Sequence, residues 1–138
     1  MPSRRSFVVS AAGSVLAMVS GVAPAGASWR LSVGRARAHP EPRPGIDGSR
    51  VLAAADVAPR LKELFDQIRA IAEIVDGVRC HCGCADVPDM YSLLSCYEGT
   101  GMAQFCEVCQ GEGRLVARLR GEGRTLAEIR KAVDDRFG

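Results

Sequence analysis

Three stretches of the chain carry apolar residues at helical spacing, separated by polar positions. In the first, residues 55–77, apolar side chains recur every three or four positions, Pro59 stands near the beginning, and Gly77 stands at the end. Proline is tolerated in the first turn of a helix and glycine commonly follows the last turn. The pattern therefore predicts an amphipathic helix over this stretch.

The second and third stretches lie closer to the carboxyl terminus. A helix is expected over residues 102–119, which Gly111 and Gly113 should weaken or kink. The third begins at Thr125, where Glu128 three positions later completes a capping box. No segment has the alternation typical of a strand. We predict a small all-α domain of three helices, with an irregular cysteine-rich loop over residues 78–101.

The segment before the helices indicates where the chain goes. Residues 1–27 contain the pair Arg4 and Arg5, then a modestly apolar stretch, and small residues before position 27. This order is typical of a cleavable bacterial export signal. The arginine pair resembles a twin-arginine signal, and an ordinary secretory signal is the alternative. We expect a protein of the periplasm or the exterior of the cell envelope.

Residues 28–50 contain three prolines and three glycines with almost no periodic apolar pattern, which predicts a flexible linker. The folded domain should then cover residues 51–138. Arg4 and Arg5 are two of the chain's 18 basic residues, so the rest holds 16 basic against 16 acidic residues. This balance favours no nucleic-acid partner. No segment after the signal is apolar enough to cross a membrane.

Six cysteines within thirty residues carry the candidate chemistry. They form a Cys-x-Cys-x-Cys triplet, a single cysteine and a Cys-x-x-Cys pair: Cys80, Cys82, Cys84, Cys96, Cys106 and Cys109. Alternating cysteines in an extended segment place their thiols on one face, and cysteines three apart on a helix also share a face. Thiolates gathered in this way bind soft metal ions, so all six are candidate metal ligands.

Two other uses of these cysteines stay open. Six cysteines in a small exported domain often form three structural disulfides. A bridge within Cys-x-Cys closes a strained ring, so the triplet would need three distant partners. Alternatively, Cys106 and Cys109 could be a redox pair in a thiol-disulfide oxidoreductase. The sequence has no nucleophile, base and orienting group in a recognisable motif, and this favours a protein that is not an enzyme.

Among metals, soft thiolates favour Cu(I), while Zn(II) also accepts four cysteines. The spacing matches neither common ferredoxin pattern, so an iron–sulfur cluster ranks lower. The function expected from the residues is metal binding, transfer or storage in the cell envelope, with a donor or acceptor protein as partner. The sequence does not define an oligomeric state.

The cysteine pattern also resembles that of a known family. The segment Arg79–Cys84, the single Cys96 before Tyr97, the Cys-x-x-Cys pair and the last twenty residues are similar to bacterial exported proteins named after the motif Pro-Cys-Tyr-Cys-Gly-Cys (PCYCGC). The resemblance covers residues 57–138, with Arg79 in place of the motif's proline and His81 in place of its tyrosine. It implies an exported, metal-handling protein, with copper as the expected metal.

A partial resemblance points to the alternative function. The carboxyl-terminal helix and the segment around Arg79 and Cys80 are similar to the periplasmic thiol-reductase subunit of cytochrome c maturation, a small three-helix protein. Its Cys-x-x-Cys spacing is not reproduced after Arg79. The resemblance implies redox exchange with an apocytochrome as the second hypothesis.

Overall fold

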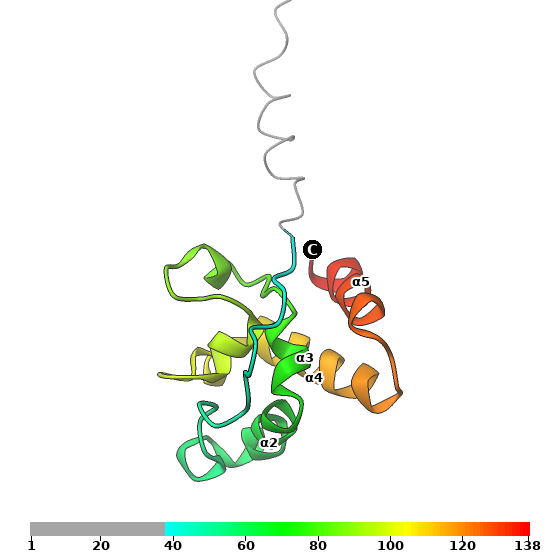
Figure 1. Ribbon diagram of the computed structural model, residues 1–138. Coiled ribbons are helices and arrows are strands. Elements are labelled where there is room, and N and C mark those ends of the chain that lie inside the picture. Colours follow the sequence, from blue (N-terminus) through cyan, green and yellow to red (C-terminus); the bar gives the residue numbers. More distant parts are fainter. Residues whose placement is uncertain (1–37) are drawn as a thin grey trace, which may run out of the picture. The chain divides into compact units, whose positions relative to one another are not determined.

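The computed structural model describes residues 38–138, so the predicted signal peptide and the first part of the predicted linker lie outside the described residues. Within these residues four α-helices follow one another: α2 Lys62–Ala70, α3 Ala72–Asp76, α4 Glu107–Gly121 and α5 Leu126–Phe137 (Figure 1). Residues 38–138 contain no strand, only an isolated bridge between Val51 and Glu98. The predicted all-α class is confirmed.

The first predicted helix is divided in the structure. A short 3-10 turn over Pro59–Leu61 leads into α2, and Ile71, with φ −123° and ψ 29°, separates α2 from α3. The apolar spacing continues through the break: Ile68 in α2 and Val75 in α3 are both fully buried. Periodicity alone could not reveal the break because the same face stays buried on both sides of it.

Helices α4 and α5 agree more closely with the sequence. Thr125 caps α5 as expected, since its backbone N–H donates to Glu128 at 2.8 Å while its hydroxyl accepts from the Glu128 backbone N–H at 3.3 Å. Helix α4 begins after Cys106 and continues through Gly111 and Gly113 to Gly121, so neither glycine ends it. Gly113 instead leaves room for the buried Tyr97 ring, which lies edge-on to Phe65 with 4.9 Å between ring centroids.

The connection between α3 and α4 contains three short 3-10 helices and no longer element. They are η3 Cys84–Asp86, η4 Leu93–Tyr97 and η5 Met102–Gln104. Leu93, Leu94 and Tyr97 of η4 are fully buried, and η4 packs against α3, α4 and η5. Helix η4 is therefore part of the core, and the connection contains five of the six cysteines, whose thiols gather around Cys109 of α4.

Residues 38–50 differ from the flexible linker expected over residues 28–50, because they lie against the helical body. Arg43 donates to the buried Asp76 carboxylate from its backbone N–H at 2.8 Å and from Nη2 at 2.7 Å. Ser92 Oγ donates to the same carboxylate at 2.7 Å. One buried acid thus holds the preceding segment, α3 and the cysteine-bearing connection together.

We predict that Asp76→Asn lowers the free energy of unfolding by about 2 kcal/mol, because charge-assisted bonds to Arg43 and Ser92 are lost. Burial alone would raise the pKa of Asp76, but the bonds from Arg43 and Ser92 outweigh burial and lower it. Because folding lowers the pKa of Asp76, this carboxylate stabilises the folded state fully at pH values above its pKa in the unfolded chain, about 4. The stabilisation is lost as the pH falls through the pKa of Asp76 in the folded state. Urea denaturation at pH 7 and pH 3 should therefore show a smaller difference between variant and parent at pH 3.

The control for this prediction is Asp66→Asn, which breaks the exposed ion pair of Asp66 with Arg69. Exposed pairs contribute little to stability, so this variant should unfold close to the parent. Equal losses in the two variants would contradict the role assigned to Asp76.

Candidate metal centre

The Cys80–Cys84 segment follows α3 and turns back into the core. Cys80 is almost fully buried, Cys84 is 9% exposed and Cys82 is half-buried. Gly83 has φ +89°, a left-handed conformation that favours glycine and lets the chain turn into η3. The turn keeps the three thiols near one another, while His81 points to a different set of partners.

Six sulfur atoms converge from three parts of the chain. In the first group, Cys80, Cys84, Cys96 and Cys109, the Sγ atoms all lie within 4.8 Å of one another. In the second group, Cys82, Cys106 and Cys109, the Sγ atoms meet the same limit. The structure thus brings together every cysteine that the sequence proposed, and Cys109 belongs to both groups. All six are free thiols.

The shortest distances within the cluster approach those of a coordination sphere. Cys80 Sγ lies 3.2 Å from Cys82 Sγ and 3.6 Å from Cys109 Sγ, and Cys82 Sγ lies 3.6 Å from Cys109 Sγ. A tetrahedral ion with bonds of about 2.3 Å to sulfur separates its ligands by about 3.8 Å. Small side-chain rotations would therefore suffice for these thiolates to enclose an ion.

Hydrogen bonding distributes charge unevenly over the thiols. Bonds from Cys109 and Cys96 lower the pKa of Cys80. The bond to Cys80 raises the pKa of Cys109. For Cys96, the bond with Cys109 lowers the pKa, but the bond to Cys80 and burial outweigh it and raise the pKa overall. Burial raises the pKa of Cys82. These contacts favour Cys80 over its three neighbours as the thiolate of the cluster.

A buried carboxyl group lies directly beside the cluster. Glu112 of α4 is fully buried, and its Oε1 accepts from the His81 backbone N–H at 2.9 Å and lies 2.7 Å from His81 Nδ1. Its Oε2 has no hydrogen-bond partner in the described part of the chain. Burial, together with the charge of Cys80, raises the pKa of Glu112 to about 9. With its pKa raised in this way, Glu112 stays neutral, so Glu112 and Cys80 are not both charged in the core.

The histidines connect this carboxyl group to the surface. His81 Nε2 lies 3.1 Å from Asp134 Oδ1 on α5, and His39 Nε2 lies 3.0 Å from the same oxygen. His39 Nδ1 accepts from the Arg79 backbone N–H at 2.9 Å. The network fixes the Cys-x-Cys-x-Cys segment against α4 and α5, and the histidines act as supporting groups beside the sulfur cluster.

Two groups near the cluster were missed by sequence reasoning. Met102 Sδ of η5 lies 2.8 Å from Cys84 Sγ and adds a thioether to the sulfur atoms. Glu112 stands three residues after Cys109, a spacing that places both side chains on one face of α4. That spacing was the available signal for Glu112, whereas no local pattern connects Met102 with Cys84, eighteen positions away.

The pair considered for redox chemistry sits at the beginning of α4. Cys106 is the N-cap residue, and its Sγ accepts from the Cys109 backbone N–H at 3.4 Å. Cys106 is half-buried, while Cys109 is fully buried and directed toward Cys80 and Cys82. Cys109 would be the resolving cysteine of such a pair, and it is already part of the larger cluster.

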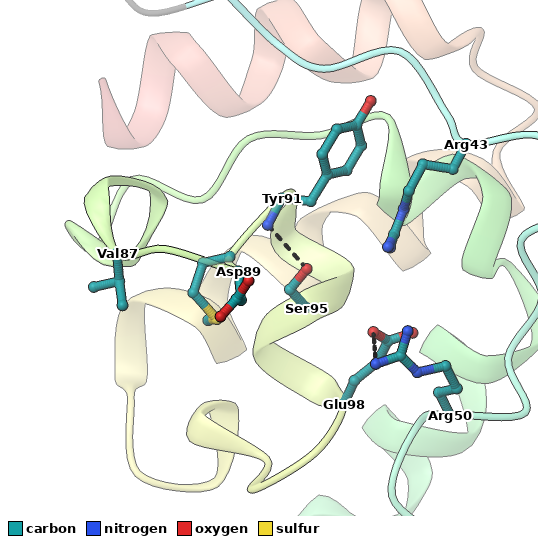
Figure 2. A pocket seen from close by; sticks show the side chains of 8 residues that line it. Arg43, Arg50, Val87, Asp89, Tyr91, Ser95 and Glu98 are labelled. Carbon is teal, nitrogen blue, oxygen red and sulfur yellow. Dashed lines mark hydrogen bonds and ion pairs between the residues drawn. The ribbon is translucent and has the colours of Figure 1, made fainter.

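A cavity of about 540 Å³ lies apart from the cysteines (Figure 2). It is lined by Arg43, Arg50, Val87, Asp89, Met90, Tyr91, Ser95 and Glu98. The Tyr91 backbone N–H donates to Ser95 Oγ at 3.2 Å, and Arg50 Nη2 lies 3.9 Å from Glu98 Oε2. No cysteine or histidine lines this cavity, so it is not continuous with the sulfur chemistry.

Fold and site together define a small all-α domain whose cysteine cluster could hold a metal ion. Comparisons of the chain with models of protein families, with curated proteins and with solved structures found no match. Among residues 38–138, no helix is long and apolar enough to cross a membrane.

Proposed function

We propose that this protein binds Cu(I) in the bacterial cell envelope and stores it or passes it to a partner protein. The observation that carries the proposal is the convergence of the Cys80, Cys84, Cys96 and Cys109 thiols inside the core. Four buried thiols with no disulfide between them match the ligand set of a soft metal ion. The family resemblance of residues 57–138 supports the same function as a prediction.

Met102 supports copper over zinc. Zinc sites in proteins use thiolate, imidazole and carboxylate ligands, whereas thioethers select Cu(I). Met102 Sδ contacts Cys84 Sγ at 2.8 Å, so a thioether is within reach of an ion held by Cys84. Zn(II) bound by the four thiolates alone is the second choice.

Two further features support export and exchange. The pair Arg4 and Arg5 resembles a twin-arginine signal, and such a signal would allow the domain to fold and load its metal in the reducing cytoplasm before export, where coordination would protect the thiolates. Cys82 and Cys106 are half-buried, so they offer an accessible edge of the cluster to a donor or acceptor protein. We assign metal transfer to this edge.

The test is elemental analysis of the exported protein, purified without oxygen, chelator or added metal, with a thiol count on the same sample. The proposal expects copper at a fixed ratio and thiols that react only after denaturation and chelation. Cys80→Ser should lose the metal. A folded, metal-free protein with three disulfides would instead establish the structural alternative.

Met102→Leu tests the choice of metal. We expect the Kd for Cu(I) to rise about tenfold, which corresponds to about 1.4 kcal/mol, while the Kd for Zn(II) stays unchanged. Competition with chromophoric chelators under anaerobic conditions measures both values. Met90→Leu is the matched control because Met90 lines the separate cavity and should leave both constants unchanged. A parallel loss of zinc and copper affinity in Met102→Leu would contradict a thioether ligand.

Thiol-disulfide exchange is the alternative function, favoured by the half-buried Cys106 at the N-cap of α4, three positions before Cys109 in a Cys-x-x-Cys pair. A reductase should turn over a small disulfide substrate, and Cys106→Ser should abolish turnover without unfolding the domain. Unchanged turnover in this variant would exclude the pair as the redox centre.

A further inference from the structure

The two groups of sulfur atoms define two coordination sites that meet at one residue. Cys80, Cys84 and Cys96 form one group with Cys109, and Cys82 and Cys106 form the other group with the same residue. Every Sγ separation within each group is at most 4.8 Å. Ligands of a trigonal ion with bonds of about 2.3 Å are separated by about 4.0 Å, so the three-sulfur group has the dimensions of a second site.

One ion cannot use the whole cluster. Soft metal ions bind at most four thiolates in such sites, and the first group already supplies four. Cys82 and Cys106 belong only to the second group, where Cys109 supplies the third sulfur. A thiolate sulfur carries several lone pairs and can bind two ions at once. Cys109 is fully buried and belongs to both groups, so it is placed to do so.

We propose that the cluster binds two Cu(I) ions, one among Cys80, Cys84, Cys96 and Cys109 and one among Cys82, Cys106 and Cys109, with Cys109 Sγ as the bridge. This inference rests on the proposed function, since it presupposes that the thiols bind metal. The second ion occupies the half-buried side of the cluster and is the one exchanged with a partner.

The experiment counts Cu(I) ions on the reduced, metal-free full chain. Native mass spectrometry and titration against a chromophoric chelator, both without oxygen, should give two ions per chain, bound in two steps. Cys106→Ser should bind one ion, with the affinity of the first step changed by less than about threefold. Cys109→Ser should also bind one ion, but more weakly than Cys106→Ser does, because it removes a sulfur from both groups. Circular dichroism of each variant checks that it is folded.

The outcomes separate this inference from the proposed function. One ion per parent chain overturns the second site and leaves copper binding intact, whereas no bound ion overturns both. Two ions in Cys106→Ser overturn the assignment of the second site. If Cys106→Ser does not fold, X-ray absorption spectroscopy of the copper-loaded parent tests the second site instead. A copper–copper scattering path that appears only with the second ion supports the bridge, and its absence at full loading overturns it.

Discussion

Gly113→Ala is expected to destabilise the protein by about 3 kcal/mol, although alanine is the better helix former. A Cβ atom at position 113 would lie 2.0 Å from Tyr97 Oη and 2.9 Å from Tyr97 Cζ. Tyr97 is fully buried and cannot move aside, and its hydroxyl donates to the Cys109 carbonyl at 2.7 Å. The propensity gain of about 1 kcal/mol is smaller than the cost of this overlap.

Urea denaturation of the parent and the variant measures this effect, and Gly121→Ala is the matched control. Gly121 belongs to the same helix, and a Cβ there meets no atom within 4 Å, so this substitution should leave stability unchanged or raise it slightly. Equal stability of the two glycine variants would contradict the close approach of Tyr97 to α4.

A double substitution identifies the atoms responsible. Tyr97→Phe removes the hydroxyl oxygen that stands 2.0 Å from the added methyl group but leaves the ring carbon at 2.9 Å. The pair Tyr97→Phe and Gly113→Ala should therefore lose less stability than the sum of the two single variants, because neighbouring substitutions are not additive. Additive losses would mean that the alanine acts elsewhere.

The helices were predictable where the signal is local. Thr125 and Glu128 specify the beginning of α5 through a capping box, which needs only residues three positions apart. The break at Ile71 could not be predicted, since apolar spacing continues across it. Gly113 was read as a helix-weakening residue because the sequence does not reveal that Tyr97, sixteen positions earlier, packs against it.

The site shows the same division between local and long-range information. Cysteine spacing identified all six sulfur atoms as candidates, and the structure gathers them into one cluster. The contact between Met102 and Cys84, and the approach of Glu112 to His81, depend on how separate segments pack. Likewise, the prolines of residues 28–50 indicated a linker, whereas Arg43 reaches a buried acid that sequence composition does not disclose.

The second large effect concerns pH: the apparent affinity for Cu(I) should rise steeply between pH 6 and pH 8. Hydrogen bonding to Cys80 raises the pKa of Cys109, and the Cys96 pKa is also raised, so both groups are protonated thiols in the metal-free protein at these pH values. The bonds that they donate lower the pKa of Cys80, so this ligand is already a thiolate. Binding at the first site must displace the protons of Cys96 and Cys109.

The sign and size of this dependence follow from proton linkage. Each proton released on binding raises the apparent affinity about tenfold per pH unit, so the protons of Cys96 and Cys109 contribute about a hundredfold rise. Titrations at pH 6, 7 and 8 against a chelator corrected for its own protonation should show a slope of at least this size, and an indicator dye in weak buffer should report at least two protons per first ion. Cys96→Ser removes one of these thiols and should lower the slope by about one. An affinity independent of pH would contradict the protonation states assigned to the cluster, because ligands that are already thiolates release no protons when the ion binds.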